Sequence, residues 1–267
     1  MGLGVASEAR AQISTAPPPP PFPSVDPNGV DATTGRLTLS RVQASVGEPG
    51  GEGLSRIFLG SGARDNLTGT LHRETFDGPL LASVGGRSIK FNVLPDGSYE
   101  NVLSPDTLTF DAGTQKYTFI AADGTVAIFD RNLRHAHGPV AASEGYLTTL
   151  TRPNGEVLTY HYTSWASSCS TGTPVLQCVR LQAVTSTLGY MIKYKYAGAV
   201  DQPGSTVLER VTAVNLAHEY CDPLAESCTF TNTWPHKVMS GDMGATGTAV
   251  ETDVTPVSHP AGARVLG

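Results

Sequence analysis

The stretch LGYMIKYKYAG, residues 188–198, decides the fold. Its residue types alternate between two sets, which are Tyr190, Ile192, Tyr194 and Tyr196 in one set and Met191, Lys193 and Lys195 in the other. An extended chain turns successive side chains to opposite faces of a sheet, so this alternation after a glycine predicts a β-strand. We expect the tyrosine set to face the core, and the two lysines and His161 of a second strand to face water.

The same pattern occurs 34 residues earlier, in RPNGEVLTYHYTSW. In both copies a turn glycine is followed by apolar or tyrosine residues at offsets of three, five and seven. These residues are Gly155 with Leu158, Tyr160 and Tyr162, and Gly189 with Ile192, Tyr194 and Tyr196. Weaker copies follow Gly97 and Gly124. The repeating unit is therefore a polar strand, a tight turn and a tyrosine-rich strand.

The glycines follow residues that favour tight turns. Asp96-Gly97, Asp123-Gly124 and Asn154-Gly155 predict two-residue hairpin turns, in which both central residues take a positive φ. A single hairpin buries too little apolar surface to be stable, whereas hairpins side by side cover one another. The sequence therefore predicts an all-β protein of antiparallel hairpins stacked side by side. The other interpretation of these strands is an ordinary β-sandwich.

The composition agrees with an all-β class. The 267 residues suffice for a hydrophobic core, and 29 glycines and 19 prolines indicate many turns. No segment shows the apolar spacing of an amphipathic helix. Only 16 % of the residues are charged and the net charge is −6, which argues against a nucleic-acid-binding protein. No apolar run is long enough for a transmembrane helix.

The four cysteines fall into two local pairs. Cys169 and Cys178 are nine residues apart, and Cys221 and Cys228 are seven apart. Either spacing can close a small loop as a disulfide. A single zinc site is the alternative, but zinc ligands usually come in pairs about two to four residues apart. Two disulfides would indicate an oxidising compartment, namely the periplasm, the cell surface or the medium.

The chain divides into four expected segments. Residues 1–23 end in the stiff spacer APPPPPFP, and ARA at 9–11 is similar to a signal-peptide cleavage site, although no apolar segment precedes it. We interpret 1–23 as a signal-peptide remnant and a disordered Pro-rich linker, the alternative being a short disordered tail. Residues 24–145 are expected to form a β-rich segment and 146–234 the tyrosine hairpins. Residues 235–267 contain no Phe, Trp or Tyr, which predicts an irregular or disordered tail and suggests a truncated or frameshifted fragment.

Several segments resemble the YD-repeat (Rhs) family of bacterial surface and secreted proteins. LTRPNGEVLTYHY and VTSTLGYMIKYKYAG look like its repeats, GVDATTGRLTLS with GGEGLSRIF like its opening segment, and YTFIAADGTVAIFD like the hairpin between them. The resemblance covers roughly residues 25–235. It implies a curved β-rich sheet that, in full-length relatives, spirals into a hollow shell around a C-terminal toxin. This chain is much shorter than such a shell, and Thr163 and Ala197 stand where the repeat has Asp.

Motifs for catalysis are absent from the sequence. It contains no nucleophile elbow, zinc-protease helix, P-loop or dinucleotide fingerprint. His135 and His137 would share one face of a strand, but no third metal ligand lies nearby. A glycosidase pair could be drawn from four carboxylates, Asp106, Asp111, Glu144 and Glu156, whose separation the sequence does not fix. We therefore expect no catalytic residue, no metal and no cofactor.

These observations favour a non-catalytic, exported β-scaffold, a fragment of a YD-repeat shell or of a surface-interaction protein. Its partners would be the remainder of a longer shell, or a surface glycan or protein, and not nucleic acid. One alternative is a carbohydrate-binding module that uses an aromatic platform of Tyr160, Tyr162, Trp165, Tyr194 and Tyr196. Packing of these rings between hairpins is favoured, because the tyrosine face is the natural core face. A secreted β-fold hydrolase is the third hypothesis.

Overall fold

The computed structural model describes residues 40–47, 53–59, 65–73, 75, 78–133, 143–165, 178–200, 208–229 and 238–240. All of them belong to one unit of the chain, Leu39–Gly267. Within these ranges the regular structure consists of strands without a helix, which confirms the all-β class. Accordingly, this part of the chain contains no helix that could cross a membrane.

The described residues form 15 strands. They are β1 (Ser40–Gly47), β2 (Gly53–Leu59), β3 (Gly69–Arg73), β4 (Leu80–Val84), β5 (Arg87–Val93), β6 (Tyr99–Glu100), β7 (Thr107–Asp111), β8 (Lys116–Ile120), β9 (Val126–Asp130), β10 (Ser143–Thr151), β11 (Val157–Trp165), β12 (Cys178–Ser186), β13 (Tyr190–Tyr196), β14 (Leu208–Asn215) and β15 (Val238–Ser240).

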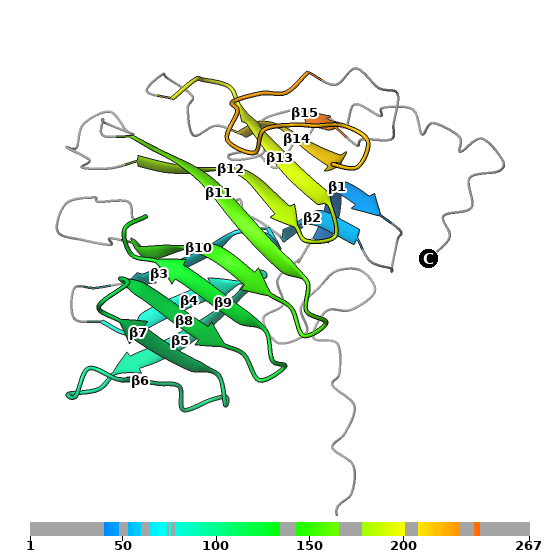
Figure 1. Cartoon of the computed structure of the whole chain (residues 1–267). Coiled ribbons are helices and arrows are strands. Elements are labelled where there is room, and N and C mark those ends of the chain that lie inside the picture. Colours follow the sequence, from blue (N-terminus) through cyan, green and yellow to red (C-terminus); the bar gives the residue numbers. More distant parts are fainter. Residues whose placement is uncertain are drawn as a thin grey trace, which may run out of the picture. The chain divides into compact units, whose positions relative to one another are not determined.

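One large sheet contains 13 of these strands. Its order is β15-β14-β13-β12-β11-β10-β3-β4-β5-β6, and β9, β8 and β7 continue from the second edge of β10. The hairpin of β1 and β2 forms a separate two-stranded sheet, which lies beside β13 and β14 (Figure 1). Strand pairs are antiparallel throughout, as expected for consecutive hairpins.

Strand β10 is the branch point of the large sheet. The first part of β10 pairs with β3 and its last three residues pair with β11, while β9 occupies the opposite edge. The strands that extend from these two edges form two layers (Figure 1). Phe91 of β5 and Phe119 of β8 meet between the layers, with ring centroids 6.1 Å apart in an edge-to-face arrangement. The boundary expected after residue 145 therefore falls inside β10, which both segments share.

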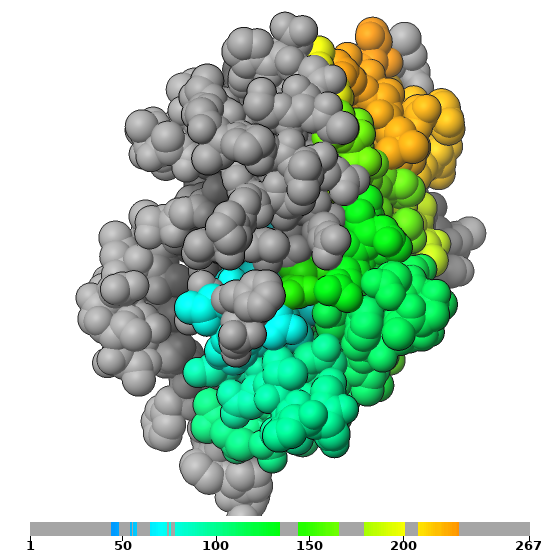
Figure 2. All heavy atoms as spheres, turned by 90° about the vertical axis from the view of Figure 1, so that its left-hand side faces the viewer, coloured from blue at the N-terminus to red at the C-terminus, as the bar shows by residue number. Residues whose placement is uncertain are grey.

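The two tyrosine strands lie in neighbouring hairpins of this sheet. β10 and β11 form the first hairpin, β12 and β13 the second, and the pairing of β11 with β12 joins them. That joining ladder runs from Leu158 opposite Ser186 to Trp165 opposite Cys178. In Figure 2 the visible coloured surface passes from green at the bottom to orange at the top, so the hairpins follow one another along the molecule. The predicted side-by-side stacking of antiparallel hairpins is thus confirmed.

The hairpin turns differ from the predicted type. The four turn glycines have φ between 83° and 89°, and each N–H donates to the carbonyl three residues earlier. These glycines are Gly97, Gly124, Gly155 and Gly189. The preceding Asp96, Asp123 and Asn154 do not have a positive φ, so the expected two-residue turns are wrong. The geometry fits a type I turn followed by a left-handed glycine, the three-residue hairpin loop with a bulge.

Side-chain hydrogen bonds accompany three of these four turns. The side-chain oxygens of Asp96, Asp123 and Asn154 each accept the N–H two residues later, at 2.8 to 3.0 Å. These Asx turns cap the loop, in which the glycine takes the positive φ and the preceding Asp or Asn does not.

Replacing a turn glycine tests the backbone constraint alone, because a Cβ at Gly155 or Gly189 would meet no atom within 4 Å. We expect Gly155→Ala and Gly189→Ala each to lower the free energy of unfolding by about 1 kcal/mol, and Asn at the same positions to cost less. Urea unfolding measures the difference. Equal unfolding free energies of the proteins with Gly, Ala and Asn at these positions would show that the left-handed conformation is not required.

Candidate functional site

The strands of each tyrosine hairpin separate after three residue pairs. β10 and β11 pair only at Thr149–Thr151 opposite Val157–Thr159, and β12 and β13 only at Ala183–Thr185 opposite Met191–Lys193. Beyond these pairs, β3 takes the free edge of β10, and β13 continues along β14. Both hairpins therefore open at the same distance from their turns.

A tyrosine hydroxyl spans each opening. The Tyr162 hydroxyl donates to the carbonyl oxygen of Leu147 at 2.8 Å, and that of Tyr196 to the carbonyl oxygen of Leu181 at 2.6 Å. In both hairpins the tyrosine lies seven residues after the turn glycine and the leucine eight residues before it. The sequence repeat is thus also a repeat of one long-range hydrogen bond. A buried carbonyl without a partner is costly, so the hydroxyl stabilises the open end of the hairpin.

The residues at offsets three and five form the core face, as predicted. Leu158 and Ile192 are fully buried, and Tyr160 and Tyr194 are 5 % and 2 % exposed. The weaker copy after Gly124 also buries its residues at these offsets, Ala127 and Phe129. The copy after Gly97 does not, because Val102 at offset five is 69 % exposed. The residues at offsets three and five therefore face the core in three of the four copies.

Two hydroxyls on this face are unusual. Among the described residues, the hydroxyls of Tyr160 and Tyr194 are buried without a hydrogen-bond partner. Their rings occupy the same position in neighbouring hairpins, five residues after the turn glycine. Burial raises the pKa of both hydroxyls, and the negative charge of Asp65 raises the pKa further. Both side chains therefore stay neutral and are unsuited to proton transfer near neutral pH.

A buried ion pair faces these tyrosines. The Nε and Nη2 atoms of Arg56, on β2, both lie 2.8 Å from one carboxylate oxygen of Asp65. The other oxygen accepts the N–H groups of Leu67 and Thr68 at 2.8 and 2.7 Å. The carboxylate thus has four donors, and the Arg56 guanidinium carbon lies 5.5 Å from the centre of the Tyr194 ring. The pair joins β2 to the turn at residues 65–68, and its arginine lies against the Tyr194 ring.

The sequence did not reveal this pair. The segment DNLT, residues 65–68, is typical of a turn capped by its own aspartate. Nothing in that pattern indicates an arginine nine residues earlier as the partner, because the contact depends on how β2 enters the turn.

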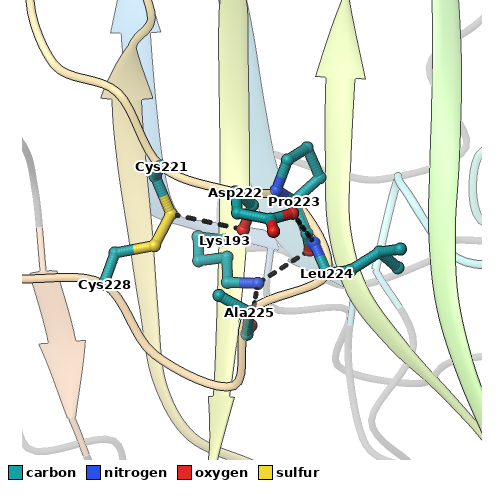
Figure 3. Close-up of a disulfide and its surroundings, with 7 residues drawn as sticks. All are labelled: Lys193, Cys221, Asp222, Pro223, Leu224, Ala225 and Cys228. Atoms are coloured by element: carbon teal, nitrogen blue, oxygen red, sulfur yellow. Dashed lines mark hydrogen bonds between the residues drawn. A yellow bond between two sulfur atoms is a disulfide. The ribbon is translucent and has the colours of Figure 1, made fainter.

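The opposite face of the sheet is not the solvated face that we expected. Lys193 is 3 % exposed, and its ammonium donates to the carbonyl oxygens of Pro223, at 2.7 Å, and Ala225 (Figure 3). The loop that follows β14 covers it, so the expectation of a wet face is wrong at this position. His161 is half-buried and its Nε2 lies 2.9 Å from the Thr185 hydroxyl. Lys195 lies partly exposed and pairs with Glu209 at 3.0 Å.

Electrostatics on this face follow from burial. The pKa of Lys193 is lowered to about 8. Loss of water is the main cause, the negative charge of Asp222 opposes it, and the positive charge of Arg180 adds to it. Burial also lowers the pKa of His161, with a second contribution from the positive charge of Lys193. His161 is therefore neutral at physiological pH.

The predicted disulfide between Cys221 and Cys228 is confirmed. It closes the loop that covers Lys193. Cys178 is the first residue of β12, and its side chain is not described. Cys169 lies outside the described residues, so the first predicted pair stays a prediction.

The candidate carboxylates have structural partners. Glu144 pairs with Arg73 at 2.7 Å and with Arg131 at 3.5 Å. Glu156 pairs with Arg152 at 2.7 Å and accepts the hydroxyl of Ser186. The other two bind backbone N–H groups, Asp106 that of Ala122 and Asp111 that of Gly113, each at 2.8 Å. These contacts fix hairpins and turns.

The other proposed ligand sets receive no support. His135 and His137 lie outside the described residues. In the parts of the chain that the structure describes, no three His, Cys, Asp or Glu side chains are grouped as metal ligands. Trp165 is buried like Tyr160 and Tyr194, and Arg180 stands 5.8 Å from the centre of its ring. These rings offer no open face on which a sugar could stack.

Tyrosine-to-phenylalanine substitutions test the two kinds of hydroxyl against each other. Tyr162→Phe and Tyr196→Phe remove a bonded hydroxyl, and we expect each to lower the free energy of unfolding by about 1 kcal/mol. Tyr160→Phe and Tyr194→Phe remove an unpartnered hydroxyl and should be neutral or stabilising. Urea unfolding of the four variants gives the comparison. A loss at Tyr160 as large as at Tyr162 would contradict this assignment.

The burial of Lys193 predicts a pH dependence of stability. Its pKa is about 8 in the folded state, below the value of about 10.4 for a free lysine. Between these two pH values the unfolded chain binds more protons, so the Lys193 contribution makes the folded state more stable as the pH rises. The unfolding free energy of the wild type relative to Lys193→Met should therefore increase from pH 8 to pH 10. A flat profile for this difference would contradict the burial of Lys193.

Comparison of the chain with family models and with curated proteins found no match.

Proposed function

We propose that this chain is a non-catalytic, extracytoplasmic β-scaffold, and a segment of a longer YD-repeat-like surface or secreted protein. Its partners are the remainder of that protein, or a surface glycan or protein. The repeated hairpin is the observation that carries the proposal. Two hairpins share the same turn, the same core positions and the same tyrosine-to-carbonyl hydrogen bond, and they lie side by side in one sheet. Repetition of such a unit extends the sheet, as stacked repeats do in repeat proteins.

The distribution of polar groups supports a structural role. The buried charges that we describe have fixed partners, which are ion pairs for Arg56 with Asp65 and for Glu156 with Arg152, and backbone carbonyls for Lys193. A catalytic centre needs a polar group that is directed at a substrate and has a pKa matched to its task. The groups with the largest upward pKa shifts are buried tyrosines, whose shifts keep them neutral. The disulfide between Cys221 and Cys228 agrees with an oxidising compartment.

The test is to fractionate the source cells and to cross-link this chain to its neighbours. We expect it in the envelope or the medium, linked to a polypeptide with further tyrosine hairpins or to a surface component. Recovery from the cytosol alone would contradict the proposal.

A hydrolase assay tests the enzymatic alternative. Purified wild type is offered a panel of glycosides and esters beside two variants, Glu144→Gln and Asp111→Asn. We expect no turnover above background. Turnover that is lost in Glu144→Gln but kept in the Asp111→Asn control would overturn the non-catalytic assignment.

A further inference from the structure

The loop between Cys221 and Cys228 is a cover over Lys193. The side chain of Lys193 rises from β13 into the ring that the disulfide closes, where two backbone carbonyls receive its ammonium (Figure 3). Next to it, on the same face of the sheet, lies a small apolar cluster of Ala183, Met191, Val214 and Cys221. The cover therefore shields both a cation and an apolar patch from water.

A second set of contacts fixes the end of the loop. One carboxylate oxygen of Glu226 lies 3.4 Å from Nη2 of Arg180 and accepts the N–H of Val200 at 3.1 Å. Inside the loop, Asp222 accepts the N–H of Leu224 at 2.9 Å through its side chain and that of Ala225 at 3.1 Å through its carbonyl. The loop thus has one conformation that places its carbonyls over the amine.

The buried ammonium opposes this closed arrangement. Taking a lysine cation out of water costs free energy, and two neutral carbonyls replace only part of its hydration. Burial lowers the pKa of Lys193, in keeping with a loss of hydration that outweighs the contacts of the charged form. Opening the loop would return the ammonium to water. A covalent link that restricts the open states of the loop counteracts this tendency.

We propose that the Cys221–Cys228 disulfide is a redox latch, and that a dithiol reductant opens the loop and exposes the Lys193 amine. Cys228 is partly buried whereas Cys221 is buried, so the reductant would attack at Cys228. This inference is independent of the scaffold proposal.

The exchange takes place in two steps. A thiolate of the reductant attacks Sγ of Cys228, the bond between the two sulfurs breaks, and Cys221 leaves as a thiolate that takes up a proton. The second thiol of the reductant then attacks the mixed disulfide and releases Cys228. Two electrons and two protons pass from the dithiol to the protein, and the reductant ends as a disulfide.

Amine footprinting tests the latch. The double variant Cys221→Ser/Cys228→Ser lacks the disulfide and therefore mimics its reduced form. It is used in place of a reductant, because a reductant would also react with Cys169 and Cys178. Both proteins are acetylated with a water-soluble ester, and the rates at Lys193 and Lys195 are read by mass spectrometry. In the wild type we expect Lys193 to react at least about tenfold more slowly than Lys195, and in the double variant we expect most of this protection to be lost.

Three other results would overturn the proposal. Undiminished protection of Lys193 in the double variant would show that the loop stays closed without the disulfide. Fast acetylation of Lys193 in the wild type would show that the loop is not a cover. Loss of the near-ultraviolet circular dichroism of the tyrosines would show global unfolding in place of local opening.

A third substitution separates the latch from a merely structural disulfide. Lys193→Met, added to the double variant, removes the cation whose hydration favours opening. Amide hydrogen exchange at residues 222–228 should then be slower than in the double variant alone, whereas adding Lys195→Met should leave it unchanged. Equal exchange in both triple variants would contradict the role of the buried amine.

Discussion

The hydrogen bond from a tyrosine hydroxyl to a distant backbone carbonyl is the interaction on which the repeated part of this structure depends. A hairpin whose strands separate exposes carbonyl groups that the ladder no longer pairs. Here Tyr162 and Tyr196 each supply the missing partner across the opening. The opening in turn gives β10 a free edge for β3, so that the two-layered part and the repeated hairpins become one sheet. Separation of the strands without this bond would leave a buried carbonyl unpaired.

The two faces of the repeated sheet bury different kinds of side chain. On the tyrosine face, large rings fill the core, and Arg56 of the neighbouring hairpin lies over the Tyr194 ring while it pairs with Asp65. On the opposite face, a lysine in a strand is covered by a cross-linked loop. In both places a charged group loses water and receives fixed partners from a segment that is not adjacent in its sheet. The sheet is therefore held together by polar contacts between elements as well as by its apolar core.

The local pattern of the sequence predicted much of the fold and little of the candidate site. Period-2 alternation placed Tyr160, Tyr194 and Ile192 in the core, because a strand turns alternate side chains to one face. The same rule failed for Lys193, since a loop 30 residues later in the chain covers it. The Asp-Gly and Asn-Gly turns were located correctly but assigned the wrong conformation, because both the two-residue and the three-residue loop place a glycine at a position of positive φ. Contacts across sheets leave no trace in local periodicity.

The separation of the strands after three pairs also has a kinetic meaning. A hairpin zips from its turn outward, and short loops close in well under a microsecond. In this chain such zipping would end at the third pair, with the far ends of the strands still unpaired. Completion then requires the long ladder between β11 and β12, which joins two hairpins across a wider sequence separation. On this view the turns and their three pairs form first. The Tyr162 and Tyr196 hydroxyls bind only when neighbouring strands hold the separated strands of their own hairpin in place.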